Sequence, residues 1–179
     1  MSVKRRFSIA LGLFVWTLPL QCATLERLSL DDMIAKSTSI VRGKVTGSYT
    51  AFAGPVIYTH YTVQISEKLK GSAGATVDVA VPGGIANGLR QSFSGTPTFQ
   101  TGDEFVFFLW TSKAGLTQVI GLTQGLFMIA PDGTADPVAT RNASHELMLD
   151  SSGRPVKDQT LTMHLSELRT RIGGSSGGK

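Results

Sequence analysis

The side chains best suited to metal or acid–base chemistry are few and lie far apart in the sequence. There are three histidines, His60, His145 and His164. A histidine-based zinc site usually has two ligands separated by about three to five residues, and no pair of these histidines has that spacing. The sequence therefore predicts no metal site and no cofactor, and it assigns the histidines to solvated or capping positions.

No nucleophile stands beside an identifiable base. Acyl transfer needs a nucleophile, a base and a group that orients the base. The G-x-S-x-G pattern is absent, and Ser94 lies in a loop without a marked partner. The acidic pairs suit structural roles, Asp31–Asp32 in the first turn of a helix and Asp103–Glu104 in a turn before a strand. We therefore predict no catalytic residues, with an unrecognised enzyme as the alternative.

The N-terminal segment has the pattern of a secretory signal peptide. Three basic residues, Lys4–Arg6, precede an apolar run from Phe7 to Leu20. That run is shorter than the roughly 20 residues of a typical membrane-spanning helix. We predict a signal peptide over residues 1–23 and export to the periplasm or beyond the cell. The mature chain has three alternative beginnings: cleavage after Cys22, cleavage after Ala23, or lipid anchoring at Cys22.

The charge of the predicted mature chain disfavours nucleic acid as a partner. The full sequence has 17 basic and 13 acidic side chains, and residues 1–23 hold three of the basic ones and none of the acidic ones. A balance of 14 to 13 gives no basic surface for nucleic acid or anionic lipid. Residues 24–179 are long enough to bury a core, although no intramolecular disulfide can form with a single cysteine.

Alternating apolar and polar residues predict several strands. The segments 39–49, 57–69 and 75–81 alternate, and residues 104–110 are apolar throughout, as expected of a central strand covered on both faces. On the inward face of the first segment, Gly43 and Gly47 indicate a bent strand or a close backbone approach. Shorter strands are predicted over 116–120, 126–130 and 136–140.

Helices are predicted only near the two ends of the mature chain. Residues 29–36 have a capping residue, Ser29, and an apolar stripe. Residues 161–172 have apolar side chains at helical spacing, and Gly173–Gly174 is expected to end that helix before a flexible tail over 173–179. Strands in the middle and short helices at both ends favour one mainly β domain over residues 24–172. An antiparallel OB-like barrel fits this pattern best.

A long connection rich in glycine and proline joins two of the predicted strands. It spans residues 82–102, with a short strand expected over 89–93. Connections of this length in a compact domain are usually functional. A recognition loop and a loop that covers one end of the barrel are the two interpretations. If the loop binds a partner, the candidate residues are Gly83, Gly84, Arg90, Phe93 and Phe99.

Three segments in order resemble the netrin-like module, the OB-fold barrel of the tissue inhibitors of metalloproteinases. They are Val41-Arg-Gly-Lys-Val45, Leu69-Lys-Gly71 and Gly102-Asp-Glu-Phe-Val-Phe-Phe-Leu109, and the resemblance covers residues 39–122. The whole chain also resembles a group of exported bacterial proteins without an established activity. The inhibitors bind the protease zinc through a disulfide-held N-terminal cysteine. Only Cys22 could match it here, and no partner cysteine exists to hold it.

Together these features predict a binding protein rather than an enzyme. We expect an exported, non-catalytic module that acts on a secreted or envelope protein and has no membrane span in the mature chain. A modulator or inhibitor of a secreted metalloprotease is the alternative that the netrin-like resemblance implies.

Overall fold

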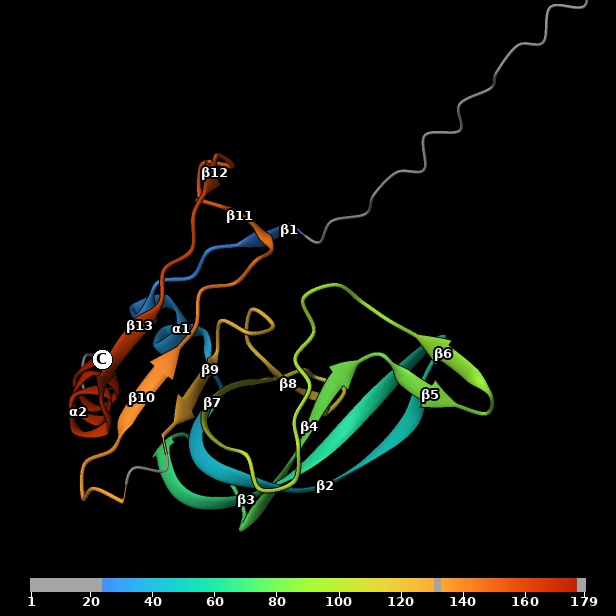
Figure 1. Cartoon of the computed structure of the whole chain (residues 1–179), viewed down its shortest axis with the longest axis horizontal. Helices are drawn as coiled ribbons and strands as arrows, with labels where there is room; N and C mark the ends of the chain where they lie inside the picture. Colours follow the sequence, from blue (N-terminus) through green and yellow to red (C-terminus); the bar gives the residue numbers. More distant parts are fainter. Residues whose placement is uncertain (1–23, 131–132, 177–179) are drawn as a thin grey trace, which may run out of the picture.

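The computed structural model describes residues 24–130 and 133–176, so the predicted signal peptide lies outside the described residues. The elements, in chain order, are β1 (Thr24–Glu26), α1 (Leu30–Lys36), β2 (Ser39–Ala53), β3 (Val56–Lys70), β4 (Thr76–Pro82), β5 (Gly84–Ala86), β6 (Leu89–Gln91), β7 (Glu104–Thr111), β8 (Thr117–Val119), β9 (Leu126–Ile129), β10 (Val138–Arg141), β11 (Leu147–Leu149), β12 (Pro155–Val156), β13 (Leu161–His164) and α2 (Leu165–Ser176). The protein is mainly β, as predicted, and its two helices lie together at the end opposite β5 and β6 (Figure 1).

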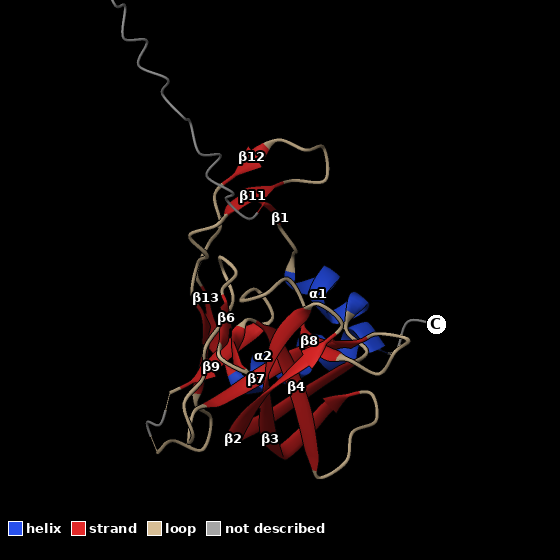
Figure 2. Ribbon diagram, turned by 90° about the vertical axis from the view of Figure 1, so that its right-hand side faces the viewer, coloured by secondary structure: helices blue, strands red, loops and turns tan. Residues whose placement is uncertain are grey.

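The main sheet is antiparallel but does not close into the predicted barrel. Its strand order is β13-β10-β9-β7-β2-β3-β4, and β8 also pairs with β7. One edge of β7 is shared, because β9 pairs with residues 105–107 and β8 with residues 109–111. Two branches therefore leave β7, and β8 approaches β4 without a described backbone ladder between them (Figure 2).

The central strand β7 separates two hydrophobic clusters, as the apolar run predicted. Val106 and Phe108 face the cluster that also contains the buried residues of α1 and α2. Phe105, Phe107 and Leu109 face the second cluster, which lies between β2, β3, β4 and β8. Because successive side chains of a strand point to opposite faces, one strand contributes to both cores.

The two longest strands form a hairpin that bends over the second cluster. Each has 15 residues, and β2 changes register against β3 between Ile40 and Val41, between Arg42 and Gly43, and between Val45 and Gly47. Such irregularities increase local twist and curvature, as expected of a bent strand. The alternative expectation, a close backbone approach, holds at Gly43, whereas a Cβ on Gly47 would meet no atom within 4 Å, so Gly47 does not face the core. Tyr49, expected on the inward face, is instead exposed, since the shifts break the simple alternation.

The first helix begins as predicted. The Ser29 hydroxyl accepts a hydrogen bond from the Asp32 N–H, and the Asp32 carboxylate accepts one from the Ser29 N–H. This reciprocal capping box satisfies two backbone donors that the first turn leaves unpaired. Leu30, Met33 and Ile34 are buried in the first cluster.

Two predictions about the C-terminal helix are wrong. Residues Leu161–His164 form β13, which pairs with β10, because the apolar–polar alternation of this segment also fits a strand and the sheet offers it a partner. The helix begins only at Leu165, and it continues through Gly173–Gly174 to Ser176. Glycine ends a helix by taking a positive φ, and neither of these glycines has one. The predicted tail is therefore helical as far as Ser176, and residues 177–179 lie outside the described residues.

Lys70, in the segment that resembles the netrin-like strand end, caps the C-terminus of α1. Its ammonium group donates hydrogen bonds to the carbonyl oxygens of Ile34, Ala35 and Ser37. These carbonyls carry the negative end of the helix dipole. The adjacent Gly71 has a φ of +73°, and a Cβ there would lie 2.4 Å from the Thr38 carbonyl oxygen. The Lys-Gly pair thus fixes β3 against the helix end.

We expect Lys70→Met to lower the free energy of unfolding by about 1–3 kcal/mol, because it removes charge-assisted hydrogen bonds and leaves the carbonyls without them. Lys68→Met, on the same strand but exposed, is the matched control and should change it by less than about 0.5 kcal/mol. Urea denaturation followed by circular dichroism measures both. Equal losses in the two variants would contradict the capping role.

The polar stretch before β13 contains a small separate sheet and a buried ion pair. β11 pairs in parallel with β1 and antiparallel with β12. Arg141, at the end of β10, donates to the Asp158 carboxylate at 2.6 Å and to the Gln159 carbonyl at 2.6 Å. Both side chains of the pair are buried. Among the described residues, no helix is long and apolar enough to cross a membrane.

Candidate functional site

The long connection after β4 folds as a β-hairpin, which the sequence analysis did not foresee. β5 and β6 pair antiparallel, with Ile85 opposite Arg90. Asn87 and Gly88 make the turn and both have positive φ values. An Asn-Gly pair is a strong hairpin signal, because two-residue turns of this kind need positive φ at both positions. The prediction of a strand over residues 89–93 is right only for its first three residues.

Several hydrogen bonds attach this hairpin, and Gly83 just before it, to the end of the β2–β3 hairpin. The Gly83 N–H donates to the Ile57 carbonyl oxygen at 2.8 Å, and the Thr59 hydroxyl donates to the Gly83 carbonyl oxygen at 2.8 Å. The Thr50 hydroxyl donates to the Ile85 carbonyl oxygen at 2.6 Å. The Gln91 side chain accepts from the Ile57 N–H at 2.7 Å. The connection is thus an ordered part of the fold.

Gly83 and Gly84 allow the chain to turn sharply from β4 into the hairpin. Their φ values are +108° and +138°, a region that side chains other than glycine rarely adopt. A Cβ on Gly84 would also lie 2.7 Å from the Thr59 hydroxyl oxygen. These two candidate residues therefore shape the site through their backbone.

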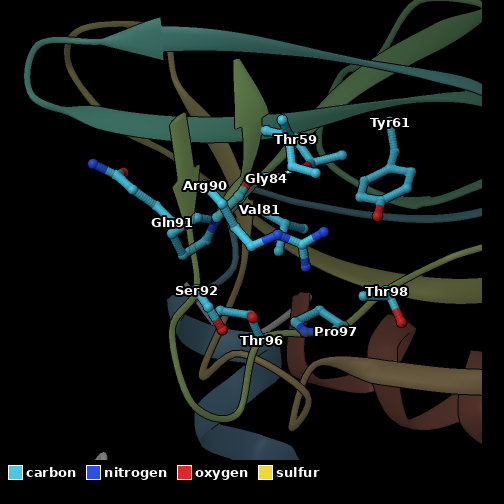
Figure 3. Close-up of a pocket in the computed structure, with 13 residues that line it drawn as sticks. Thr59, Tyr61, Val81, Gly84, Arg90, Gln91, Ser92, Thr96, Pro97 and Thr98 are labelled. Atoms are coloured by element: carbon cyan, nitrogen blue, oxygen red, sulfur yellow. Dashed lines mark hydrogen bonds between the residues drawn. The ribbon is translucent and has the colours of Figure 1, made fainter. Parts of the chain in front are cut away.

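The hairpin and the segment after it enclose a pocket of about 190 Å³. Its walls come from β3, β4, β5, β6 and the residues after β6, with Tyr61, Val81 and Pro97 among them (Figure 3). The lining residues are Thr59, Tyr61, Val81, Pro82, Gly83, Gly84, Ile85, Arg90, Gln91, Ser92, Thr96, Pro97 and Thr98. The pocket thus combines apolar walls with several hydroxyl groups.

Arg90 is the charged side chain of this pocket. Figure 3 shows it reaching into the pocket, with its guanidinium group on the side of Tyr61 and Pro97. The other lining residues include no aspartate, glutamate, lysine or histidine. Within the described part of the chain, the guanidinium has no ion pair and no side-chain hydrogen bond. It is therefore available to an anion that enters the pocket.

Tyr61 presents a second available donor. Its side chain is only 6% exposed, and its ring packs edge-on against Phe99 at a centroid distance of 4.8 Å. The hydroxyl group has no hydrogen-bond partner among the described residues, and the residue lines the pocket. The buried side-chain atoms without a partner in the described residues belong to Arg141, so the Tyr61 hydroxyl is accessible from the pocket, where it and Arg90 offer donors to a polar ligand atom.

The structure places the remaining two candidates differently. Phe93 is 43% exposed and lies beside Gly83 at the edge of the pocket. Phe99 is buried in the second cluster, where it packs against Tyr61, Phe105 and Phe107. Phe99 is therefore a core residue that packs behind Tyr61 and does not line the pocket. The sequence could not separate the two phenylalanines, because both lie in a segment without regular periodicity.

The far end of the loop is attached to the polar segment before β11. The Ser94 hydroxyl donates to the Glu146 carboxylate at 2.9 Å. The Glu146 side chain also lies over Gly95, whose φ is +75°. No described histidine is hydrogen-bonded to Ser94, so the contact ties the loop to the segment before β11 and forms no Ser–His pair.

A second polar cluster, absent from the sequence analysis, lies on the face formed by β2, β3 and β4. The Tyr49 hydroxyl donates to Asp78 at 2.7 Å, and His60 Nδ1 lies 2.8 Å from the same carboxylate. The Tyr49 and His60 rings stack at 4.7 Å. The hydrogen bond to Asp78 raises the pKa of Tyr49 above its ordinary value. These contacts join residues 29 and 18 positions apart on different strands. They depend on the register of the strands, which no local sequence pattern gives.

This cluster lacks the parts of a hydrolytic site. An Asp–His pair can orient a general base, but no described serine, threonine or cysteine is hydrogen-bonded to His60. Nor do the described residues include a group of three or more histidine, cysteine, aspartate or glutamate side chains placed to hold a metal ion. No protein-family model, curated protein or solved structure matches this chain.

Proposed function

We propose that the protein is an exported, non-catalytic binding module that acts on a secreted or envelope protein through the β5–β6 hairpin. The observation that carries the proposal is the pocket beneath the hairpin, where Arg90 and the Tyr61 hydroxyl have no partner among the described residues. Export is inferred from the signal-peptide pattern of residues 1–23. The same segment contains Cys22, on which a zinc contact like that of the inhibitors would depend.

Exposed apolar side chains on the hairpin and just after it support a protein partner. Ile85, Leu89 and Phe93 are 51%, 60% and 43% exposed, and we refer to these three residues as the hairpin patch. Because Ile85 pairs with Arg90 across the hairpin, these two side chains share the face that lines the pocket. Protein interfaces typically combine apolar and aromatic side chains with arginine.

We also propose that β2, β3, β4, β7 and β8 correspond to an OB-like barrel that is open between β4 and β8. OB folds are five-stranded, partly open barrels. The antiparallel neighbours β4-β3-β2-β7-β8 and the approach of β8 to β4 support this correspondence. The three segments that resemble the netrin-like module lie in β2, at the end of β3 and in β7.

Partner capture with matched variants tests the binding role. The full chain, produced in its host with a C-terminal tag, is used to capture proteins from the secreted and envelope fractions. We expect a partner that the unchanged chain and Leu147→Ser retain and that the double variant Leu89→Ser/Phe93→Ser loses at least tenfold. Leu147 is an exposed leucine of similar accessibility on β11.

Each outcome has a definite meaning. A partner retained equally by the double variant would remove the hairpin patch from the binding surface. Turnover abolished by replacing one polar side chain would contradict a non-catalytic role. Capture of a secreted metalloprotease, followed by inhibition on titration, would select the modulator among the possible binding functions.

A further inference from the structure

We propose that the pocket beneath the β5–β6 hairpin binds the C-terminal carboxylate of a peptide chain, with Arg90 and Tyr61 as the donors. This inference rests on the proposed binding function and names the chemical group that the pocket takes. Two features point to an anion: Arg90, an exposed arginine without an acidic partner among the described residues, and the Tyr61 hydroxyl, which belongs to a largely buried residue, is accessible from the pocket and has no hydrogen-bond partner among them.

The charge of the pocket favours a singly charged ligand. Arg90 is its single cation, and none of the 13 lining residues is acidic. A guanidinium group matches a planar carboxylate through two parallel hydrogen bonds. A phosphate monoester carries close to two negative charges at neutral pH and would retain one of them without a counter-charge in this pocket. A carboxylate is neutralised by Arg90 alone.

The size of the pocket favours a small terminal group. Its volume of about 190 Å³ is roughly that of six water molecules at about 30 Å³ each. Pockets for nucleotides and drug-sized ligands usually exceed about 300 Å³. A chain terminus and one short side chain fit this half-open space.

The position of the apolar groups distinguishes a chain terminus from an acidic side chain. Val81, Pro82 and Pro97 form apolar walls next to the arginine, and Ile85 lies on its face of the hairpin. A C-terminal residue carries its carboxylate and its own side chain on one Cα, so the carboxylate can meet Arg90 while the side chain contacts the apolar walls. Aspartate and glutamate place the charge at the end of the side chain and leave no apolar group beside it.

The test is a titration of the ¹⁵N-labelled full chain monitored by nuclear magnetic resonance. N-acetyl-leucine supplies the terminal carboxylate, N-acetyl-leucinamide is its neutral match, and N-acetyl-glutamic acid α-amide supplies a side-chain carboxylate. We expect N-acetyl-leucine to shift the Arg90 Nε–H and the amides of Gly83 and Gly84, with a Kd on the order of 1 mM for a ligand of this size. The amide should give no saturable shift, and the glutamate probe should bind at least threefold more weakly.

Variants assign the donors. Arg90→Gln should weaken binding of N-acetyl-leucine at least tenfold, and Tyr61→Phe about threefold. The control variant is Arg154→Gln, which should leave the affinity unchanged. Arg154 lies on the β11–β12 connection, far along the chain, and its side chain is 79% exposed. Retention of the folded spectrum in Arg90→Gln separates loss of binding from loss of structure.

Three results would overturn the inference: equal shifts with the neutral amide, unchanged affinity in Arg90→Gln, or tighter binding of inorganic phosphate than of N-acetyl-leucine. The titration is independent of partner capture. Saturable binding without any captured protein would leave the pocket assignment standing and remove the protein partner. Capture that depends on the hairpin patch, without any carboxylate binding, would remove only the pocket assignment.

Discussion

Replacing Asp158 by asparagine should lower the free energy of unfolding by about 3–5 kcal/mol, a large part of the roughly 5–15 kcal/mol typical of a domain. The Asp158 and Arg141 side chains are 1% and 2% exposed, and their polar atoms are 2.6 Å apart. The substitution removes the counter-charge and leaves a guanidinium ion buried. Nε and Nη1 of Arg141 have no hydrogen-bond partner within the described residues, so no second carboxylate compensates for the loss.

Chemical denaturation of the variant and of a surface control measures this effect. Glu26 pairs with Lys36 at 3.7 Å, and both side chains are about half exposed. Glu26→Gln should therefore cost less than about 0.5 kcal/mol. A cost below about 1 kcal/mol for Asp158→Asn would contradict the importance of the buried pair.

The same pair predicts a dependence of stability on acid. Burial acts to raise the pKa of Asp158, but hydrogen bonds from the backbone N–H groups of Ser144 and Gln159 and from Arg141 outweigh it and hold the pKa below its ordinary value. A lowered pKa adds stability that is present above the unfolded-state value of about 3.9 and is lost as the pH falls through the folded-state value. The difference in the free energy of unfolding between the unchanged chain and Asp158→Asn should therefore be constant above about pH 5 and should shrink below about pH 4.

Gly43→Ala should destabilise the protein by about 3 kcal/mol. A Cβ at this position would lie 2.6 Å from the Gln64 carbonyl oxygen and 2.6 Å from Cγ1 of Val63. Backbone and a fully buried side chain must both move to admit it, and overpacking of this kind costs about 1–3 kcal/mol, occasionally more. The change in the midpoint of urea denaturation measures the loss.

Gly47, on the same strand, provides the matched control, because a Cβ there would meet no atom within 4 Å. Gly47→Ala should change the free energy of unfolding by less than about 1 kcal/mol, and it should be stabilising if the backbone accommodates alanine without strain. Similar effects at the two glycines would show that flexibility in β2, and not the close approach at Gly43, governs the response.

The sequence predicted those parts of the fold that depend on local periodicity. The alternating segments became β2, β3 and β4, and the unbroken apolar run became β7 with a core on each side. The glycines in β2 indicated its curvature. The open sheet was not predicted, because the branching of β7 between β8 and β9 depends on pairing across 6 to 23 residues and not on any local pattern.

The candidate site was only partly predictable. The unusual length and composition of the connection pointed to the region in which the pocket lies, and Gly83, Gly84 and Arg90 line that pocket. The Asn87–Gly88 pair is a local hairpin signal, but the sequence-based prediction did not include this turn. Tyr61 could not have been identified, because its alternation correctly predicted an inward-facing ring and gave no indication that the hydroxyl would reach a cavity. The burial of Arg141 could not be predicted either, because this residue lies in a polar stretch of the sequence.

The pairing of the first described strand has a consequence for the order of folding. Thr24–Glu26 pairs with Leu147–Leu149, and α1 shares its hydrophobic cluster with α2. A chain that emerges N-terminus first therefore leaves part of the apolar face of α1 uncovered until α2 has appeared. Contacts between distant segments slow folding, so we expect a late, cooperative final step that truncation within α2 would prevent. The interval before it is the period in which the chain is most open to aggregation, or to a chaperone that protects it.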